Sequence, residues 1–425
     1  MKKHYIAIMG FGTVGGGTYD ILVGNGEYIK RTQGLDISVK YILDRDASIL
    51  SRRGVDTSLF CGDIAKLAAD KDVELVVETM GGVEPAKTFI TAMLKAGKSV
   101  VTANKELLAK HWFELEPIAE ANGCGLYFEA SCVGGVPIIR ALGESFQGDR
   151  IRSIYGIING TTNYILSKMT SEGISYDEAL SQAQALGFAE FDPTSDVEGF
   201  DAAYKLSILG SLAFHTCVPY GSIFREGITK VTARDIANAR DLGYTIKLLA
   251  IGTRRGNDVE ARVHPVFVPQ SHPLASVSGA FNAVYLNGDY VGDLMFYGAG
   301  AGAHPTGSAI VSDIIKGLQG KPRYCDFENN GKLEKSINLV GDFTSGYYIN
   351  MTVEDKVGVL SRISTVLGDN GVSIKAATQV PCDGDAANVV FLTHPSREHA
   401  VMRSLESIGK LASVRSIDSM IRVLQ

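Results

Sequence analysis

The sequence lacks three features that would place it in large classes of proteins. It has only six cysteines in 425 residues and no CxxC pair, so neither a disulfide framework nor a zinc site is indicated. It has no basic excess, because 41 Lys and Arg stand against 47 Asp and Glu, so nucleic-acid binding is not expected. Its longest apolar runs, such as residues 206–218, are too short and too interrupted to span a bilayer. We therefore expect a cytoplasmic protein with reduced thiols and no membrane partner.

The length and composition are those of a multidomain globular protein. At about 150 residues per domain, the chain has room for about three domains. Hydrophobic residues make up 45% and charged residues 21% of the chain, which excludes overall disorder. Lys2, Lys3 and His4 precede an apolar stretch, as in a signal peptide. Glycines from residue 10 onward break that stretch, so we interpret residues 5–9 as a first β-strand.

A glycine-rich turn follows this strand. Gly10, Gly12 and Gly15 have GxGxxG spacing, and residues 18–22 have helical character. The order of strand, glycine turn and helix is the context that a dinucleotide site requires. Gly10 and Gly12 would let the backbone approach a pyrophosphate, Gly15 would let the helix pack on the strand, and the helix N-terminus would supply N–H donors. A glycine turn with no ligand is the alternative.

Strands and helices continue to alternate through the first 135 residues. Apolar runs predict further strands at 38–43, 74–79, 99–102 and 125–129. A helix is expected over 85–96, with Pro85 early in it and Gly97 just past its end. This alternation predicts an α/β fold with a Rossmann-type doubly wound parallel sheet over residues 1–135, to which a segment near 300–320 is expected to return.

The rest of the chain divides into three segments. Residues 136–320 mix longer helices with strands and predict a central α+β domain, and the polar, glycine-rich residues 321–346 predict a linker. Residues 347–425 predict strands at 347–353, 372–379 and 387–393, helices at 359–369 and 396–408, and a final strand. The order βαββαβ is that of a ferredoxin-like sandwich.

The end of the second strand gives conflicting signals about the cofactor. Asp44 stands where an acid commonly holds a ribose 2′-hydroxyl, which favours NAD. Arg45 beside it could pair with a 2′-phosphate, which favours NADP. A solvated pair at a strand end is the third interpretation, and the sequence leaves all three open.

Two lysines are candidates for chemistry. Asp201 and Lys205 are four residues apart, hence on one face of a helix that is otherwise apolar. A surface ion pair is the alternative, but the apolar surroundings indicate partial burial, which is typical of functional charges. Lys105 follows a parallel strand at the end where ligands bind in such sheets, although most loop lysines are simply solvated. Residues 129–137 and 159–164 are polar, glycine-rich segments that could be sites or plain turns.

Taken together, these motifs closely resemble the homoserine dehydrogenase family with a C-terminal ACT regulatory domain. The resemblance covers essentially the whole chain. The family signature around its catalytic lysine is matched without a gap by Ala183, Gly187, Asp192, Pro193, Asp196, Gly199, Asp201 and Lys205. The segments 10–15, 103–105, 159–163 and 298–302 match further family motifs in the family's order.

The resemblance implies a reaction and a role for each matched residue. The reaction is reversible hydride transfer between NAD(P)H and L-aspartate 4-semialdehyde, giving L-homoserine on the route to threonine, methionine and isoleucine. Lys205 would donate the proton, with Lys105 beside it. Glu190, Asp201, Asn159, Gly160 and Thr161 would bind the substrate. The cofactor would contact Gly10, Gly12, Thr13, Val14, Gly15, Arg45, Thr79, Lys105 and Gly302.

The resemblance also implies a cation, an effector and an assembly. Glu129 and the carbonyls of Cys132, Gly134 and Val136 would hold a monovalent cation, which we expect to be sodium. An amino acid, usually threonine in this family, would bind near Asp355, Gly358, Leu360 and Asn370. A domain that only mediates association is the alternative to this regulatory role. The central domain would carry the substrate and the dimerisation surface, giving a homodimer or homotetramer.

Three departures and two rival functions accompany the resemblance. Cys132-Val133, Asp44 and Val357 differ from the residues that the family more often has. An aspartate-semialdehyde dehydrogenase would need a nucleophilic cysteine paired with a histidine, and no convincing pair is present. A catalytically silent amino-acid sensor would have no need of Glu190, Asp201 and Lys205 together.

Overall fold

The computed structural model describes residues 2–320, 338–382 and 384–424. Most of the predicted linker, residues 321–337, lies outside this range. The chain forms two compact units, which we describe separately. Unit 1 comprises residues 1–159, 201–223 and 281–337, and unit 2 comprises residues 160–200, 224–280 and 338–425. The predicted central segment 136–320 is therefore divided between them.

Unit 1 is built on a parallel sheet with the strand order β3-β2-β1-β4-β5-β6. All of its neighbouring strands are parallel, and the apolar residues of β1 and β4, such as Ile6, Ile8 and Val76, are fully buried. The order reverses between β1 and β4, the position where such sheets bind ligands. The predicted doubly wound sheet is thus confirmed. Its strands are β1 (Lys3–Met9), β2 (Asp36–Leu43), β3 (Phe60–Cys61), β4 (Val73–Glu78), β5 (Ser99–Thr102) and β6 (Leu126–Tyr127).

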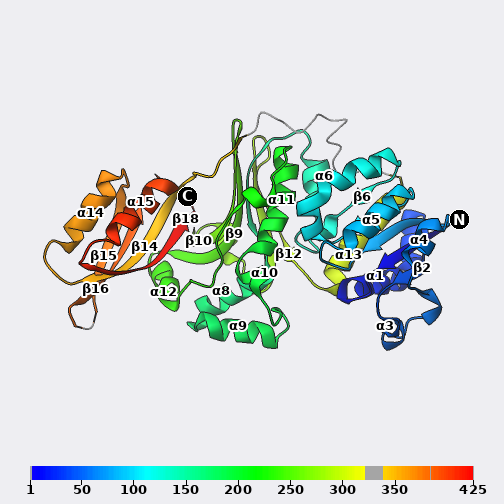
Figure 1. Ribbon diagram of the computed structural model, residues 1–425, viewed down its shortest axis with the longest axis horizontal. Coiled ribbons are helices and arrows are strands. Elements are labelled where there is room, and N and C mark those ends of the chain that lie inside the picture. The colour runs from blue at the N-terminus through cyan, green and yellow to red at the C-terminus, as the bar shows by residue number, and fades with distance from the viewer. Residues whose placement is uncertain (1, 321–337, 383, 425) are drawn as a thin grey trace. The chain divides into compact units, whose positions relative to one another are not determined.

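A helix from far along the chain packs on the first helix of this sheet (Figure 1). Helix α13 (Ala303–Leu318) crosses α1 (Thr13–Gly24). A Cβ on Gly17 would lie 2.4 Å from the carbonyl oxygen of Ala303, and one on Gly307 would lie 3.0 Å from the Gly17 carbonyl carbon. Only glycine permits this close approach. The other helices here are α2 (Gly26–Gln33), α3 (Ser48–Arg52), α4 (Ile64–Ala69), α5 (Ala86–Lys95), α6 (Lys105–Ala121) and α7 (Ile138–Arg140).

Unit 1 also contains an antiparallel ladder and most of a buried helix. Strand β11 (Phe281–Gly288) pairs with β7 (Ile151–Ile157) and with β12 (Gly292–Ala299). Helix α11 (Phe200–Phe214) buries every residue except Phe200 and Tyr204. A helix that is apolar nearly all round belongs inside a protein, so any charge on it is desolvated.

Unit 2 combines a long β-hairpin with helices and with the C-terminal domain. Strands β9 (Tyr244–Arg255) and β10 (Asp258–Pro269) pair along their whole length. Helix α9 begins where the Ser175 side chain accepts a hydrogen bond from the Glu178 N–H, which satisfies one of the free N–H groups at the start of the helix. The other elements are α8 (Gly160–Glu172), α9 (Tyr176–Ala185), α10 (Thr194–Val197), α12 (Ala233–Asp241), β8 (Phe224–Arg225) and β13 (Asn338–Leu339).

The C-terminal domain has the predicted βαββαβ order. Its sheet, ordered β18-β14-β16-β15, is antiparallel, and both helices pack on one face of it through residues such as Ile363 and Val401 (Figure 1). Strand β18 also pairs in parallel with β10, Arg422 opposite Val266. Its elements are β14 (Thr344–Glu354), α14 (Val359–Asp369), β15 (Ile374–Pro381), β16 (Ala386–Thr393), β17 (Ser396–Arg397), α15 (Glu398–Ile408) and β18 (Val414–Val423). Within the described residues, no helix has the length and apolar character needed to cross a bilayer.

Candidate active site

Lys205 and Asp201 form a buried ion pair on α11. The Lys205 Nζ atom lies 2.6 Å from Oδ2 of Asp201 and donates to the Ile158 carbonyl oxygen at 2.8 Å. The amide of Asn159 donates to the same Asp201 oxygen at 2.9 Å. Lys205 is 8% and Asp201 4% exposed, so the surface-pair interpretation is wrong. An ammonium group has three N–H donors, and two acceptors leave one N–H for a substrate oxygen.

Lys105 approaches the same carboxylate from the parallel sheet. It is the first residue of α6, which begins where the Asn104 side chain accepts from the Leu107 N–H. Its Nζ lies 3.2 Å from Oδ1 of Asp201, and 43% of its side chain is exposed. Burial would raise the pKa of Asp201, but Lys205, Lys105 and the Asn159 amide hold that pKa well below its usual range. The carboxylate therefore stays ionised between two lysines.

The glycine turn lies at the switch point of the parallel sheet. Gly10 has a φ of +90°, and Thr79 at the end of β4 donates its hydroxyl to the Gly10 carbonyl at 2.8 Å. A Cβ on Gly15 would lie 2.1 Å from that carbonyl oxygen, whereas a Cβ on Gly12 would meet nothing within 4 Å. The space beside Gly12 and the first N–H groups of α1, at Thr13 and Val14, fit a pyrophosphate.

Asp44 and Arg45 follow β2 beside this turn. Oδ2 of Asp44 accepts from the Phe11 N–H at 2.7 Å, and Oδ1 accepts from the Asp46 N–H at 3.1 Å. Asp44 is therefore tied to the glycine turn. Sequence reasoning missed Arg53, whose guanidinium lies 5.6 Å from the Phe11 ring centroid and 1.8 Å from where a Cβ of Gly16 would stand. The signal that could have found it is the group of arginines shortly after the second strand.

The segment before α13 meets the predicted cation loop. Gly302 precedes the helix with a φ of +121°. A Cβ on Gly134 would lie 2.6 Å from the Gly300 carbonyl carbon, and the Gly135 N–H donates to the Ala299 carbonyl at 3.1 Å. Residues 132–136 and 298–302, far apart in sequence, are thus in direct contact within unit 1.

Within the loop itself, Glu129 is held by backbone donors. Its carboxylate accepts from the N–H groups of Ile139 at 3.0 Å and Arg140 at 2.8 Å. Burial raises the pKa of Glu129 to about 7 and that of the Cys132 thiol to about 12, so a thiolate ligand is not available there. Val133 and Gly134 both have positive φ values, +57° and +54°. No cluster of His, Cys, Asp and Glu able to hold a metal ion occurs among the described residues, so backbone carbonyls would have to supply the ligands.

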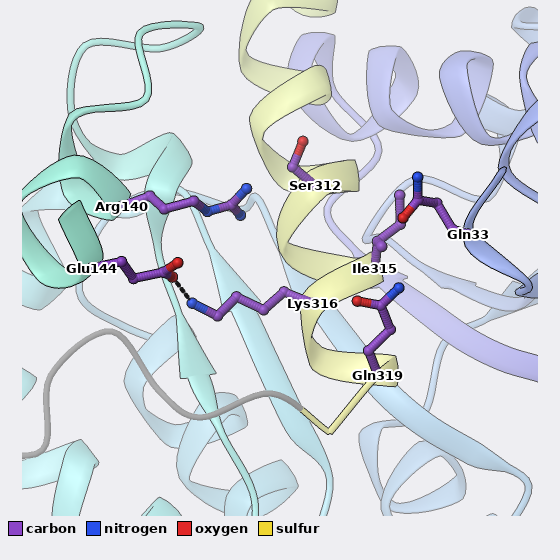
Figure 2. A pocket seen from close by; sticks show the side chains of 7 residues that line it. All are labelled: Gln33, Arg140, Glu144, Ser312, Ile315, Lys316 and Gln319. Atoms are coloured by element: carbon purple, nitrogen blue, oxygen red, sulfur yellow. Dashed lines mark hydrogen bonds and ion pairs between the residues drawn. The ribbon is translucent and has the colours of Figure 1, made fainter.

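A cavity of about 260 Å³ opens beside the second half of α13 (Figure 2). Inside it Lys316 pairs with Glu144, and Arg140 lies 3.3 Å from the buried Asp313. Ser312, its first residue on the helix, is ten residues beyond Gly302, which is roughly 15 Å along the axis. The cavity is therefore separate from the segment around Gly302. It is lined by Gln33, Arg140, Glu144, Ser312, Ile315, Lys316 and Gln319.

Three predicted substrate residues belong to unit 2. Thr161, in the first turn of α8 after Gly160, donates its hydroxyl to the Phe188 carbonyl at 2.6 Å. Glu190 lies two residues beyond Phe188, with its side chain exposed and its carbonyl accepting from Gln184 at 3.1 Å. Unit 2 thus brings Thr161 and the Glu190 loop together, while Asn159 lies with Asp201 in unit 1.

The predicted effector residues are distributed over both ends of α14. Gly358, with a φ of +85°, precedes the helix, and Asp355 nearby accepts from the Gln379 amide at 2.9 Å. Leu360, in the first turn, is 38% exposed. Asn370 ends the helix, where its amide donates to the Val366 carbonyl at 2.9 Å. It lies roughly 18 Å along the axis from Gly358, so one chain does not gather all four residues.

Comparison with known proteins assigns the family. Residues 137–315 match the family model "Homoserine dehydrogenase", residues 10–129 its NAD-binding domain, and residues 347–410 the ACT domain. The chain is 42% identical to homoserine dehydrogenase of Corynebacterium glutamicum, over 98% of this chain and 95% of that protein. It is 40% identical to the enzyme of Neisseria gonorrhoeae, over 100% of this chain and 99% of that protein.

Solved structures agree with this assignment. A homoserine dehydrogenase from Thiobacillus denitrificans superposes with a TM-score of 0.94 at 37% identity, covering 100% of this chain and 99% of that one. A hyperthermophilic archaeal homoserine dehydrogenase in complex with NADPH gives 0.66 at 30% identity, covering 76% and 100%. The chain therefore belongs to the homoserine dehydrogenases, which are NAD(P)-dependent oxidoreductases.

Proposed function

We propose that Lys205 is the general acid and base of the homoserine dehydrogenase reaction. The observation that carries this role is the single Asp201 carboxylate that holds the buried Lys205 ammonium and faces Lys105. The bound nicotinamide supplies the hydride to the aldehyde carbon of L-aspartate 4-semialdehyde. Lys205 donates a proton to the aldehyde oxygen as it becomes the hydroxyl of L-homoserine, and Lys105 stabilises the developing negative charge. In the reverse direction, Lys205 accepts the proton.

The substrate's amino-acid end would be bound by Asp201 of unit 1 and by Glu190, Gly160 and Thr161 of unit 2. Asp201, already oriented by Asn159, and Glu190 attract the substrate ammonium. The N-terminal turn of α8, with Gly160 and Thr161, offers N–H donors and a positive dipole end to the carboxylate. This division orients the substrate so that its aldehyde oxygen reaches the remaining N–H of Lys205.

The cofactor lies along the glycine turn, and its preferred form is NADP. The cofactor would be held by Gly10, Gly12, Thr13, Val14, Gly15 and Thr79 beside the open space at Gly12, and Lys105 and Gly302 would hold its nicotinamide half. Both oxygens of Asp44 already accept backbone N–H groups, whereas the Arg53 guanidinium lies beside Phe11 of the glycine turn and Arg45 directly follows Asp44 in the chain. A guanidinium pairs well with a 2′-phosphate.

A sodium ion would be held by the loop 129–136, which contacts the segment 298–302. The carbonyls of Cys132, Gly134 and Val136 are hard oxygen ligands of the kind that such a cation prefers, and the curled backbone at Val133 and Gly134 favours their convergence. Glu129 supplies the charge. The ion would fix this loop against residues 298–302. Replacing sodium by a bulky organic cation is expected to lower the turnover number, and an unchanged rate would remove the ion from the proposal.

The ACT domain regulates the enzyme by binding an amino acid, threonine, the end product of one branch of homoserine metabolism. Asp355, Gly358 and Leu360 at the start of α14 form one part of this site, and Asn370 contributes from the other end of the helix. Because one chain does not gather these residues, a homodimer or homotetramer completes the site. We place the enzyme in the cytoplasm, in threonine, methionine and isoleucine biosynthesis.

Initial rates test these assignments together. Homoserine oxidation is followed by the absorbance of the reduced cofactor, with NAD and NADP separately and with threonine added. We expect kcat/KM to be on the order of tenfold higher with NADP, and lower rates with threonine. No reduction of either cofactor would refute the activity and favour the silent sensor. Activity that threonine leaves unchanged, with no heat on titration, would leave the ACT domain a role in association only.

A further inference from the structure

A buried lysine outside the catalytic pair lies in the middle of unit 2. Lys247 on β9 is 3% exposed, and its Nζ donates to the side-chain oxygen of Asn163 at 3.2 Å and to the Val277 carbonyl. Burial lowers the pKa of Lys247 to about 8. Burying an ammonium is costly unless it is fully hydrogen bonded, so its presence on a strand of apolar neighbours calls for a specific role.

The Lys247 ammonium determines the orientation of the Asn163 side-chain amide. Because Nζ can only donate, the amide oxygen of Asn163 must point toward it, which directs the Nδ2 group at the carbonyls of Gly279 at 2.9 Å and Val277 at 3.3 Å. The Gly279 N–H in turn donates to the Ser167 hydroxyl at 3.1 Å. The turn at residues 277–279 is thereby fastened to helix α8 at two successive turns.

Asn163 lies in the first turn of α8, which also holds the Glu190 loop. Thr161 donates its hydroxyl to the Phe188 carbonyl at 2.6 Å, and the Tyr164 and Phe188 ring centroids are 4.9 Å apart. A displacement of this turn would therefore move Gly160, Thr161 and the segment leading to Glu190 together. These are the residues to which the proposed function gives the substrate's amino-acid end.

We propose that Lys247 is a positioning residue that sets the affinity for homoserine by locking Asn163 and with it the first turn of α8. Lys247 is not among the residues assigned to the cofactor or to the reacting atoms, and the inference rests on the proposed substrate role of Thr161 and Glu190. Displacements of about 1 Å at a substrate site are enough to cost a large factor in catalytic efficiency. The effect should fall on the KM for homoserine and not on the KM for the cofactor.

The chain offers a matched control in unit 1. Lys98 is 4% exposed, and its Nζ donates to the carbonyls of Asp70 at 2.5 Å and Val73 at 2.8 Å. It directly precedes β5 and so lies at the amino end of the strands, whereas ligands bind at the carboxyl end of such a sheet. Lys98→Met therefore removes the same kind of buried ammonium without touching either half of the site.

The test compares steady-state constants of Lys247→Met, Asn163→Ala, their double variant and Lys98→Met. We expect Lys247→Met to raise the KM for homoserine by about tenfold or more, with the KM for the cofactor unchanged and a smaller change in kcat. Asn163→Ala should do the same, and the double variant should show no further rise, because both act through one bond. Lys98→Met should lower the thermal midpoint and leave both KM values unchanged. If Lys247→Met does not fold, Asn163→Ala and Lys247→Arg, which keeps donors, carry the comparison.

A Thr161→Ala variant separates this inference from the function on which it rests. If Thr161→Ala raises the KM for homoserine while Lys247→Met and Asn163→Ala do not, the positioning role is overturned and the substrate site stands. If Thr161→Ala also leaves that KM unchanged, the substrate role of α8 fails, and the role of Lys247 fails with it. If Lys247→Met raises the KM for homoserine and the KM for the cofactor by the same factor and also lowers the thermal midpoint, Lys247 contributes to stability only.

Discussion

Lys205 lies with its Nζ atom 2.6 Å from Oδ2 of Asp201, one helical turn away, in a helix whose other faces are apolar. The spacing alone would give an exposed pair worth only a few tenths of a kcal/mol. Burial raises the cost of breaking this pair, because removing one partner of a desolvated pair leaves an uncompensated charge inside the protein. A buried ion pair with so high a desolvation cost is expected where its charge has a function. Here it lies beside the partly exposed side chain of Lys105.

Lys205→Ala is expected to lower kcat by roughly 10²- to 10⁴-fold, the usual contribution of a general acid. The residues assigned to the cofactor lie on other elements than α11, so the dissociation constant of the reduced cofactor should stay near the wild-type value. Initial rates and a fluorescence titration of the reduced cofactor measure the two quantities.

Lys110→Ala is the matched control for this substitution. Lys110 lies on α6 in a partly exposed pair with Glu106 at 2.7 Å, so its removal should leave kcat unchanged. A Lys205→Ala enzyme with wild-type turnover would refute the assignment of the general acid.

Asp201→Asn is expected to change stability in a pH-dependent way. The folded-state pKa of Asp201 lies below that of an ordinary carboxyl group, so its ionised form stabilises the fold fully above the unfolded-state pKa of about 3.9. That contribution is lost as pH falls from there through the folded-state value.

The difference in urea midpoint between wild type and Asp201→Asn should therefore be the same at neutral pH and in mild acid, and should shrink once the pH drops below about 4. The variant should also lose activity, because Lys205 and Lys105 would face each other without the carboxylate. A difference in midpoint that grew on acidification would contradict the ionised state assigned to Asp201.

Two glycines of the same turn should respond differently to alanine. A Cβ at Gly15 would lie 2.1 Å from the Gly10 carbonyl oxygen, and at Gly12 it would meet no protein atom within 4 Å. Gly15→Ala should therefore destabilise the fold, whereas Gly12→Ala should melt like wild type but bind the cofactor on the order of tenfold more weakly. Thermal midpoints and cofactor titrations distinguish them. Wild-type cofactor affinity in Gly12→Ala would mean that the pyrophosphate lies elsewhere.

Features that depend on spacing along the chain could be predicted from the sequence. The glycine turn, the four-residue spacing of Asp201 and Lys205, and the βαββαβ order are local patterns, and the fold they imply is the one observed. The strand expected at 125–129 is shorter, β6 (Leu126–Tyr127), because a 3-10 turn begins at Glu129, whose carboxylate binds the start of α7.

Contacts between residues distant in sequence could not be predicted in this way. The sequence left Asp44 open between a ribose ligand and a solvated pair, and the structure shows it accepting from the Phe11 N–H. Lys247 gave no local signal, and the group of arginines after the second strand did not single out Arg53, because the positions of both residues depend on how α3 and β9 pack against other elements. The contacts of these residues are determined by tertiary packing and cannot be read from the periodicity of the sequence.

Arg422→Met is expected to destabilise unit 2 strongly. Arg422, on β18, is 2% exposed and pairs with Glu226 and with Glu398 of the ACT domain, both at 2.5 Å. Glu398 also accepts from the Tyr347 hydroxyl at 2.8 Å. Methionine fills similar volume but leaves two carboxylates without their shared cation, which costs about 3–5 kcal/mol in comparable buried pairs.

Chemical denaturation followed by circular dichroism measures this loss, and Arg415→Met on the same strand is its control. Arg415 pairs with Asp385 in solvent, so its removal should barely move the denaturation midpoint. Because Arg422 joins the ACT strand to the segment after β8, its loss should also weaken any response to threonine, whereas Arg415→Met should keep it. Equal midpoints for the two variants would mean that the two carboxylates protonate or separate at little cost, and that Arg422 does not hold the ACT domain to the rest of unit 2.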